Sequence, residues 1–389
     1  MRINDVRRLA AVAASGALAL SLAACGSSTS NSTSAVSAGH NGDWAKAQSA
    51  ADGGGMDALV AAAKKEGQLN VIALPRTWAN YGELMDTFQK KYGITVNDAN
   101  PDGSSGDEIN ALKSTKGQAS APDVVDVGNS YAVSGAKDGL YASYKVATWG
   151  DIPANIKDDG GLWWADLGGY MSIGCNAAAV GGTCPKTFKD LDNPAYKGKV
   201  ALSGDPTSGN SPFNAVWAAA LANGGSADSI QPGIDFFKKL NSEGIYNKTK
   251  ATDATTQAGA TPIVVNWDYL NLGLADKLKS AGVTWTVTVP SDGLIAAYYD
   301  QAVNANAPHP AAARLWQEFL YSQDADGGQN GWIKGFARPA ELAAMLKNGK
   351  AVGADKLPAV DDKKPFTPSE DQTAKAKAAI TSAWAAAVQ

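Results

Sequence analysis

Short apolar runs alternate with helix-like segments from residue 57 onward, and this alternation restricts the possible folds more than any other feature of the chain. The runs at residues 69–74, 94–96 and 124–127 each suit a buried strand. Each run is followed by a polar loop and then by apolar residues at helical spacing. This order predicts an α/β fold in which mostly parallel strands are joined by right-handed crossovers.

A second set of strands and helices follows the first. Residues 200–203 and 262–266 suit buried strands, and residues 283–289 alternate apolar side chains with threonine, as a half-buried strand does. Between the first two strands lies a helix that Asn210 or Ser211 can cap, and this helix carries one apolar face. The chain therefore contains enough strands for two sheets.

The length of 389 residues also favours two lobes over one compact core. Crossings between the lobes are expected near residues 170–176 and 289–294, where the pattern passes from one set to the other. The predicted divisions are a signal peptide at 1–24, a flexible tether at 25–55, the first part of lobe 1 at 56–169, lobe 2 at 170–290, and a return to lobe 1 with C-terminal helices at 291–389.

The N-terminus has the features of an export signal. Three arginines precede an apolar segment that is too short to span a membrane comfortably. The segment ends in Leu-Ala-Ala-Cys25-Gly, which resembles a bacterial lipobox and implies cleavage before Cys25 and lipidation of this cysteine. We expect the mature protein to lie on the extracytoplasmic face of the cell membrane, held by this lipid anchor. The alternative is a plain secretory signal with a cysteine there by chance.

Charge and histidine content argue against two classes of function. The net charge is −4 and no arginine-rich run occurs, so we expect no nucleic acid partner. The two histidines, His40 and His309, lie far apart in the sequence, which argues against a histidine-ligated metal. No metal site and no cofactor are predicted.

The remaining two cysteines, Cys175 and Cys184, are expected to form a disulfide outside the cell. The bond would close a small loop, for which the chain-entropy estimate is roughly 2–3 kcal/mol. Their spacing differs from Cys-x-x-Cys, so we interpret the pair as a structural bond and not as a redox site.

Several segments, taken in order, resemble one known family. They are residues 66–71 at the first strand, 121–127 at the third strand, 170–176, 188–200 with Asp205-Pro206, and 305–313 before a helix that ends at Ser322. With the lipobox, these segments make the chain resemble the extracellular solute-binding proteins of bacterial ABC importers. The resemblance is to the type with two lobes and two inter-lobe crossings, which includes ferric-ion, polyamine, thiamine and aminophosphonate binders. It covers most of the mature chain and implies the periplasmic-binding-protein type II fold.

The resemblance also implies a function and partners. A small-molecule ligand would be held between lobes that close by hinge bending and then passed to an ABC permease in the membrane. Such a protein is expected to be a monomer, to use no cofactor and to perform no chemistry on the ligand.

The family's binding positions correspond to loops at the carboxyl ends of strands, where open α/β sheets bind ligands. The candidate ligand-binding residues are Arg76, Thr77, Trp78, Ser104, Ser105, Asn129, Tyr131, Asp205, Thr207, Ser208, Trp267, Asp268 and Tyr299.

The sequence leaves two alternatives for the charge of the ligand. Trp267 resembles an aromatic residue of polyamine binders, and carboxylates such as Asp205 and Asp268 would suit an amine, so we favour an amine-like or polyamine-like cation. The alternative is a phosphate-type or aminophosphonate ligand, because the serines and threonines at helix starts favour anions. A ferric-ion binder is less well supported, because Tyr298-Tyr299 stands later in the chain than the family's tyrosine pair. Asp300 is likewise offset from the acidic position of the polyamine pattern.

A secreted lipoprotein hydrolase is the rival from a different class. It would need a base, yet His40 lies in the tether and His309 lies between two prolines. No Gly-x-Ser-x-Gly motif occurs, and Ser134-Gly-Ala-Lys137 matches only a four-residue pattern without its companion motifs. We therefore predict a binding protein and not an enzyme.

Overall fold

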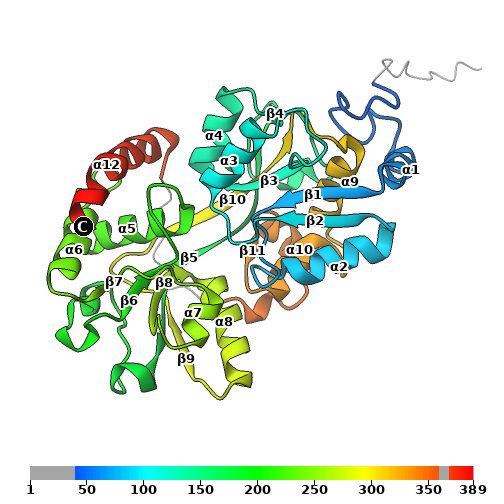
Figure 1. Ribbon diagram of the computed structural model, residues 1–389. Coiled ribbons are helices and arrows are strands. Elements are labelled where there is room, and N and C mark those ends of the chain that lie inside the picture. The colour runs from blue at the N-terminus through cyan, green and yellow to red at the C-terminus, as the bar shows by residue number, and fades with distance from the viewer. Residues whose placement is uncertain (1–39, 359–367, 389) are drawn as a thin grey trace, which may run out of the picture. The chain divides into compact units, whose positions relative to one another are not determined.

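The computed structural model describes residues 40–358 and 368–388 (Figure 1). The predicted signal peptide, Cys25 and the tether as far as residue 39 lie outside this part of the chain. None of the helices in the two described ranges combines the length and apolar character that a membrane crossing requires. The α-helices are α1 (Met56–Glu66), α2 (Tyr81–Tyr92), α3 (Ser105–Ser114), α4 (Asn129–Lys137), α5 (Asn210–Ala222), α6 (Gln231–Ser242), α7 (Asp253–Gln257), α8 (Asp268–Ser280), α9 (Pro310–Leu320), α10 (Gly328–Lys334), α11 (Leu342–Lys347) and α12 (Glu370–Val388).

The strands alternate with these helices in both halves of the chain. They are β1 (Gln68–Ile72), β2 (Thr95–Ala99), β3 (Val124–Gly128), β4 (Tyr141–Ala142), β5 (Trp164–Asn176), β6 (Val200–Leu202), β7 (Tyr246–Asn247), β8 (Ile263–Trp267), β9 (Trp285–Thr288), β10 (Ala296–Asn304) and β11 (Arg338–Pro339). β1 and β2 pair with each other, and the other strands are linked in the order β3-β10-β5-β8-β6-β7, with β4 on β10 and both β9 and β11 on β5.

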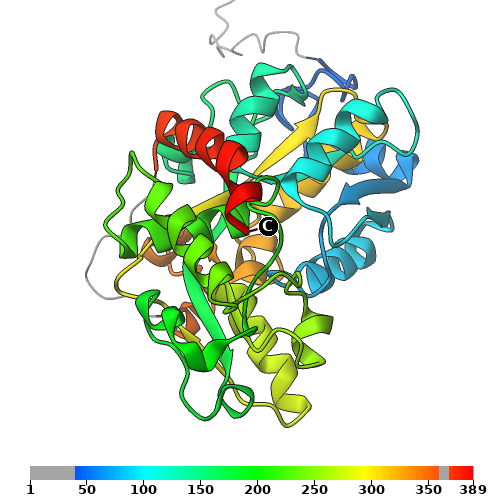
Figure 2. The same ribbon diagram turned by 60° about the vertical axis from the view of Figure 1, so that its left-hand side comes forward.

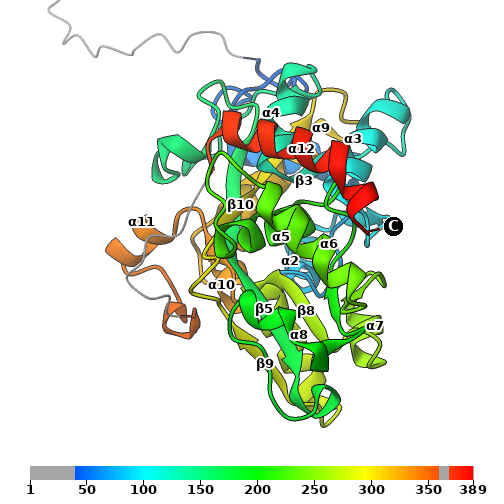
Figure 3. The same ribbon diagram turned by 90° about the vertical axis from the view of Figure 1, so that its left-hand side faces the viewer.

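The long strand β5 takes part in two sets of pairings. Its first half pairs with β10 and β11, whereas its second half, from Met171, pairs with β8 and β9 (Figures 1 and 3). We call the part around β1–β4, β10 and β11 lobe 1, and the part around β6–β9 lobe 2. The change of partners near Tyr170 lies at the first crossing that the sequence predicts. The chain returns between β9 and β10, where Met171 N–H donates to Ile295 O.

The α/β character is as predicted, but the strand directions are mixed where the sequence predicts mostly parallel sheets. Parallel pairing holds for β1–β2, β6–β7 and β6–β8. The strands β5 and β10 run antiparallel to their partners. These two strands carry the chain between the lobes, so they enter each set of strands from the opposite end. Parallel pairing, which requires a crossover connection, is therefore found only between strands of the same lobe.

The start of α3 follows its local sequence, whereas the start of α5 does not. Ser104 caps α3, since its hydroxyl accepts from Asp107 N–H while the Asp107 carboxylate accepts from Ser104 N–H. For α5 the sequence predicts a cap by Asn210 or Ser211, but the cap position is Gly209 and no side chain caps it. The Asn210 side chain lies instead over the backbone of Gly128, where a Cβ atom would come within 2.3 Å of the amide.

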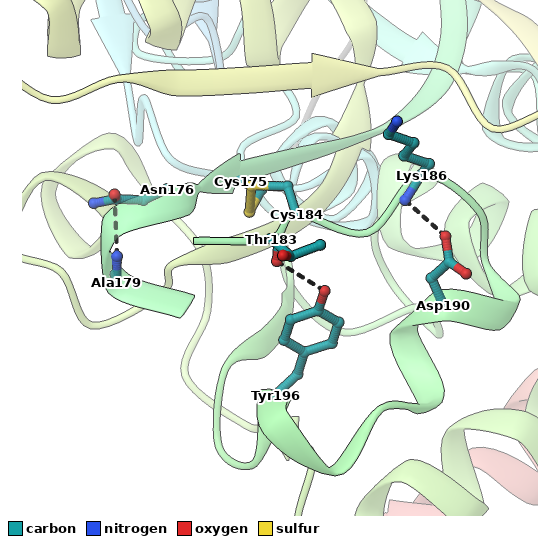
Figure 4. The surroundings of a disulfide bond; sticks show 8 residues. All are labelled: Cys175, Asn176, Ala179, Thr183, Cys184, Lys186, Asp190 and Tyr196. Carbon is teal, nitrogen blue, oxygen red and sulfur yellow. Dashed lines mark hydrogen bonds between the residues drawn. A yellow bond between two sulfur atoms is a disulfide. The ribbon is translucent and has the colours of Figure 1, made fainter. Parts of the chain in front are cut away.

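The disulfide between Cys175 and Cys184 is present, as the sequence predicts. It joins the end of β5 to the loop that follows it (Figure 4). The Tyr196 hydroxyl donates to Thr183 O, 2.9 Å away, and Ala179 N–H donates to the Asn176 side chain. Hydrogen bonds and the covalent link together hold this loop against lobe 2.

Residues 40–55 are folded, although the sequence assigns them to the tether. Trp44, Ala47 and Ala50 are buried. The guanidinium of Arg314 on α9, itself 1% exposed, donates to Ala45 O and Ala47 O. A buried arginine needs such acceptors, so this segment belongs to the packed part of the chain.

Candidate functional site

A cavity of about 570 Å³ lies where loops of both lobes meet. Lobe 1 contributes the loop after β1, the loop before α3 and the start of α3. Lobe 2 contributes the loop between β6 and α5, the loop before α7, and residues of β8 and α8. Loops that follow strands β1, β2 and β6 therefore line it, as expected for ligand sites of open α/β sheets.

The cavity wall contains eight of the residues that the sequence predicts. These are Arg76, Thr77, Trp78, Ser104, Ser105, Asp205, Ser208 and Tyr299. The ring centroids of Trp78 and Tyr299 lie 4.9 Å apart with their planes nearly perpendicular. They form one aromatic corner of the cavity.

The five other predicted residues do not line this cavity. Trp267 and Asp268 are fully buried behind it, and Asp268 forms an ion pair with Arg338 at 2.7 Å. Thr207 donates to the Asp205 side chain and shapes the loop. The amide of Asn129 donates to the buried Asp300, 2.9 Å away. Tyr131 lies on α4 and reaches the loop from outside the cavity.

Hydrogen bonds of Tyr131, Gly106 and Lys250 join the lobes around the cavity. The Tyr131 hydroxyl donates to Ser208 O at 2.9 Å, and Gly106 N–H donates to the same oxygen at 3.3 Å. The ammonium of Lys250 in lobe 2 donates to Asp102 O in lobe 1 at 2.8 Å. These contacts bring the loop between β6 and α5 against the N-terminus of α3.

Two residues of the cavity wall carry buried hydrogen-bond donors without partners. Within the described residues, the side-chain amide nitrogen of Asn210 and the indole nitrogen of Trp78 are buried and have no hydrogen-bond partner. Both residues line the cavity, and Asn210 is only 8% exposed. A buried donor without an acceptor costs roughly 1–3 kcal/mol, so an acceptor on a ligand would recover free energy here. The helices α3 and α5, which start at the cavity wall, add positive partial charge.

Most of the carboxylates around the cavity are already engaged. Asp205 accepts from Thr207, Asp107 accepts from Ser104, and Asp253 forms an ion pair with Lys277. Glu108 is buried and accepts from Asp126 N–H, and burial raises its pKa well above the usual range. Asp102 is exposed.

The tyrosine pair does not form one site. Neighbouring residues of a strand project to opposite faces. Tyr299 lines the main cavity, while Tyr298 and Asp300 line a separate cavity of about 80 Å³. Burial raises the pKa of Tyr299, an effect that the nearby Trp267 and Asn210 side chains oppose. Two adjacent tyrosinate ligands, as the ferric alternative requires, are therefore not available on one side of β10.

The candidate base His309 lies away from the cavity. Its Nδ1 is 2.9 Å from Asp123 and its Nε2 is 2.8 Å from the Gln68 amide. The hydrogen bond to Asp123 raises the pKa of His309. Ser134, on α4, donates to Tyr131 O. Neither residue lines the 570 Å³ cavity.

Sequence reasoning missed several residues of the wall. Lys250, Asn266 and Glu108 line the cavity. A signal existed for Asn266, which is the last residue before Trp267 in a predicted buried strand. Lys250 lies in a threonine-rich loop that has no motif, so only the fold brings it to Asp102.

The comparisons with known proteins agree with this fold. Residues 120–366 match the model of a family described as bacterial extracellular solute-binding protein. Among solved structures, the periplasmic binding protein AfuA from Actinobacillus pleuropneumoniae with fructose-6-phosphate bound has a TM-score of 0.62 at 19% identity, covering 82% of this chain and 99% of that chain. Iron-bound HitA from Pseudomonas aeruginosa has a TM-score of 0.56 at 18% identity, and the match covers 83% of this chain and 99% of that chain.

A putative spermidine/putrescine ABC transporter protein from Listeria monocytogenes gives a TM-score of 0.61 at 12% identity, covering 82% of this chain and 98% of that chain. These structures confirm the two-lobe fold predicted from the sequence. No curated protein matches the chain by sequence.

Proposed function

Because the chain belongs to the family of bacterial extracellular solute-binding proteins, we propose that it captures a small polar solute in the 570 Å³ cavity and delivers it to the permease of an ABC importer. The observation that carries this proposal is the cavity itself, which has walls from both lobes and unpartnered donors in them. A site of this size and composition suits a small solute.

The solute that this site suits best carries an anionic, oxygen-rich group. The unpartnered donors of Asn210 and Trp78 require acceptors. The N-termini of α3 and α5 favour negative charge by about 0.3–1 kcal/mol each. The Lys250 ammonium, whose hydrogen bond is to a backbone carbonyl, adds a positive charge at the edge of the cavity. In AfuA the bound ligand is fructose-6-phosphate, a compound of this class.

An amine-like cation, which the sequence favours, is the second candidate. The aromatic corner of Trp78 and Tyr299 and the exposed Asp102 support it. Two of its expected partners, Trp267 and Asp268, are instead buried outside the cavity. This weakens the amine reading relative to the anionic one. The Listeria protein, described as a spermidine/putrescine transporter, has the same fold at 12% identity.

A thermal-shift titration of the purified protein tests these proposals. The compounds are fructose 6-phosphate, 2-aminoethylphosphonate, citrate, spermidine, thiamine and ferric citrate, with a chromogenic ester as the enzyme control. A solute-binding protein shows a saturable upward shift of Tm without turnover of the compound. Consumption of the ester, with no saturable shift from any compound, would instead support the hydrolase.

The substitution Lys250→Met separates the two solute classes. We expect it to weaken binding of an anionic solute about fivefold to tenfold, since about 1.4 kcal/mol corresponds to a factor of ten. It should leave binding of a cationic solute unchanged or slightly stronger. Isothermal titration calorimetry measures both affinities. The matched control is Lys279→Met, an exposed lysine of α8 that does not line the cavity. Equal loss in both variants would argue against a role for Lys250.

We also propose that a lipid on Cys25 holds the protein at the outer face of the membrane, on the strength of the lipobox resemblance. Cells that express Cys25→Ser are expected to release the protein into the medium or periplasm, because a single substitution removes the acylated thiol. Immunoblots of membrane and soluble fractions measure the distribution. Retention of the variant at the membrane at wild-type level would contradict the lipid anchor.

A further inference from the structure

The C-terminal helix α12 packs against elements of both lobes. It lies on α6 of lobe 2 and reaches α4 of lobe 1 (Figures 2 and 3). Its buried residues share one face, and they are Thr373, Ala376, Ile380, Trp384 and Ala387. Trp384 meets Phe237 of α6 and Tyr246 of β7 edge to face, at centroid distances of 5.6 and 6.1 Å. The larger part of this face is therefore anchored on lobe 2.

Near its start, α12 presents one lysine to lobe 1. The ammonium of Lys377 lies 3.0 Å from the centroid of the Tyr131 ring and 3.4 Å from the Ser130 hydroxyl. No ion pair of the described residues includes Lys377. Burial lowers its pKa to about 7. The face of an aromatic ring is a stabilising partner for such a partly desolvated cation.

The same tyrosine contacts the solute cavity from its other end. The Tyr131 hydroxyl donates to Ser208 O, and Ser208 lines the cavity. Gly106 N–H, at the first turn of α3, donates to the same carbonyl. One side chain thus connects α12 through its ring face with the loop between β6 and α5 through its hydroxyl.

We propose that Lys377 is a positioning residue for solute binding, which fixes the Tyr131 ring so that its hydroxyl holds the Ser208 loop of lobe 2 against lobe 1. The role of this contact in holding a solute rests on the proposed function, whereas its role in joining the lobes does not. Helix α12, anchored on lobe 2 and touching lobe 1 through Lys377, stabilises the arrangement in which the lobes meet around the cavity. Opening the lobes would separate Lys377 from Tyr131 and Ser208 from Gly106.

The test compares four single variants of the full chain. Lys377→Met keeps the aliphatic length and removes the charge, and Tyr131→Phe keeps the ring and removes the hydroxyl. Lys377→Arg restores a cation over the ring and is the rescue variant. Lys375→Met changes an exposed lysine of the same helix and is the control. The variants Lys377→Met and Tyr131→Phe are also combined.

The first readout needs no ligand. Hydrogen exchange of the Gly106 amide reports its bond to Ser208 O, and we expect exchange to be about tenfold faster in Lys377→Met and in Tyr131→Phe. The double variant should exchange no faster than the single ones, because both act through one contact. Lys377→Arg and Lys375→Met should match the wild type. Unchanged exchange in Lys377→Met, or equal acceleration in Lys375→Met, would overturn the inference.

The second readout is the dissociation rate of fructose 6-phosphate. We expect faster release from Lys377→Met by a similar factor, with Tm of the ligand-free protein nearly unchanged. Wild-type release from this variant would overturn the positioning role while the proposed function stands. If the wild type binds no compound of the panel, the proposed function fails. Hydrogen exchange of the Gly106 amide then decides by itself whether α12 joins the lobes.

Discussion

The substitution Arg338→Met is expected to destabilise the protein by about 3–5 kcal/mol, because it leaves a buried carboxylate without its counter-ion. Asp268 is fully buried, and its Oδ2 lies 2.7 Å from Arg338 Nη1. Burial raises the pKa of Asp268, an effect that Arg338 opposes. The guanidinium also lies over the Tyr170 ring at 4.4 Å and donates to Pro358 O. Urea unfolding at about pH 7 measures the loss.

Two comparisons identify the cause of this loss. Arg76→Met breaks an ion pair with Asp86 that is more than half exposed, and we expect a cost of no more than about 1 kcal/mol. The double variant Arg338→Met/Asp268→Asn removes both charges and should regain part of the stability. A loss below about 1 kcal/mol for Arg338→Met would show that water or another group satisfies Asp268.

The second large effect is a dependence of stability on pH at a buried pair of carboxyl groups, Asp126 and Asp166. The Tyr81 hydroxyl donates to both, at 2.6 and 3.3 Å, and Gln301 donates to Asp166. Burial raises the pKa of Asp166 from 3.8 to about 6, and burial together with the neighbouring Asp166 charge raises the pKa of Asp126 well above its usual range.

The sign of the effect follows from these directions. A carboxyl group whose pKa is raised by folding binds its proton more tightly in the folded state. Its contribution to stability is therefore full below about pH 4 and is lost as the pH rises through about 6. A shift of about two units corresponds to about 3 kcal/mol.

The substitution Asp126→Asn removes one of the two charges. Its amide oxygen can still accept from Tyr81. Its amide nitrogen can donate to the neighbouring Asp166 carboxylate, whose pKa a hydrogen bond from Asp126 lowers. We expect the variant to be more stable than the wild type by about 2–3 kcal/mol at about pH 8 and similar to it at about pH 4. Urea unfolding at both pH values measures this. Asp86→Asn, at an exposed position, serves as the control. A variant less stable than the wild type at about pH 8 would contradict the assignment.

The sequence predicts those parts of the fold that depend on local patterns. Strand and helix periodicity indicates the α/β repeats, and the first crossing falls at β5, where the pairing changes near Tyr170. The pairing of Cys175 with Cys184 follows from their number and compartment. The antiparallel direction of β5 and β10 has no local signal, because it depends on which strands lie beside them in space.

In the candidate site, too, local patterns predict some residues, whereas the positions of others depend on contacts between distant parts of the chain. Trp78 lies in the loop after β1 and Trp267 is the last residue of β8, yet Trp78 lines the cavity and Trp267 is fully buried. Which way a residue turns at the end of a strand depends on neighbours far away in the sequence. Asp268 illustrates the point, since its partner Arg338 lies 70 residues further along the chain. Residues 40–55 are a similar case, because the buried Arg314 that binds them lies on α9.

Because β5 supplies hydrogen bonds to strands of both lobes, the protein cannot be dissected into two autonomous pieces. A gene fragment that begins at Met171 would yield a lobe 2 without the start of its longest strand. The remaining fragment would expose the edge of β10 to unwanted association. Each lobe therefore needs the β5 residues of the other lobe to complete its own set of strands.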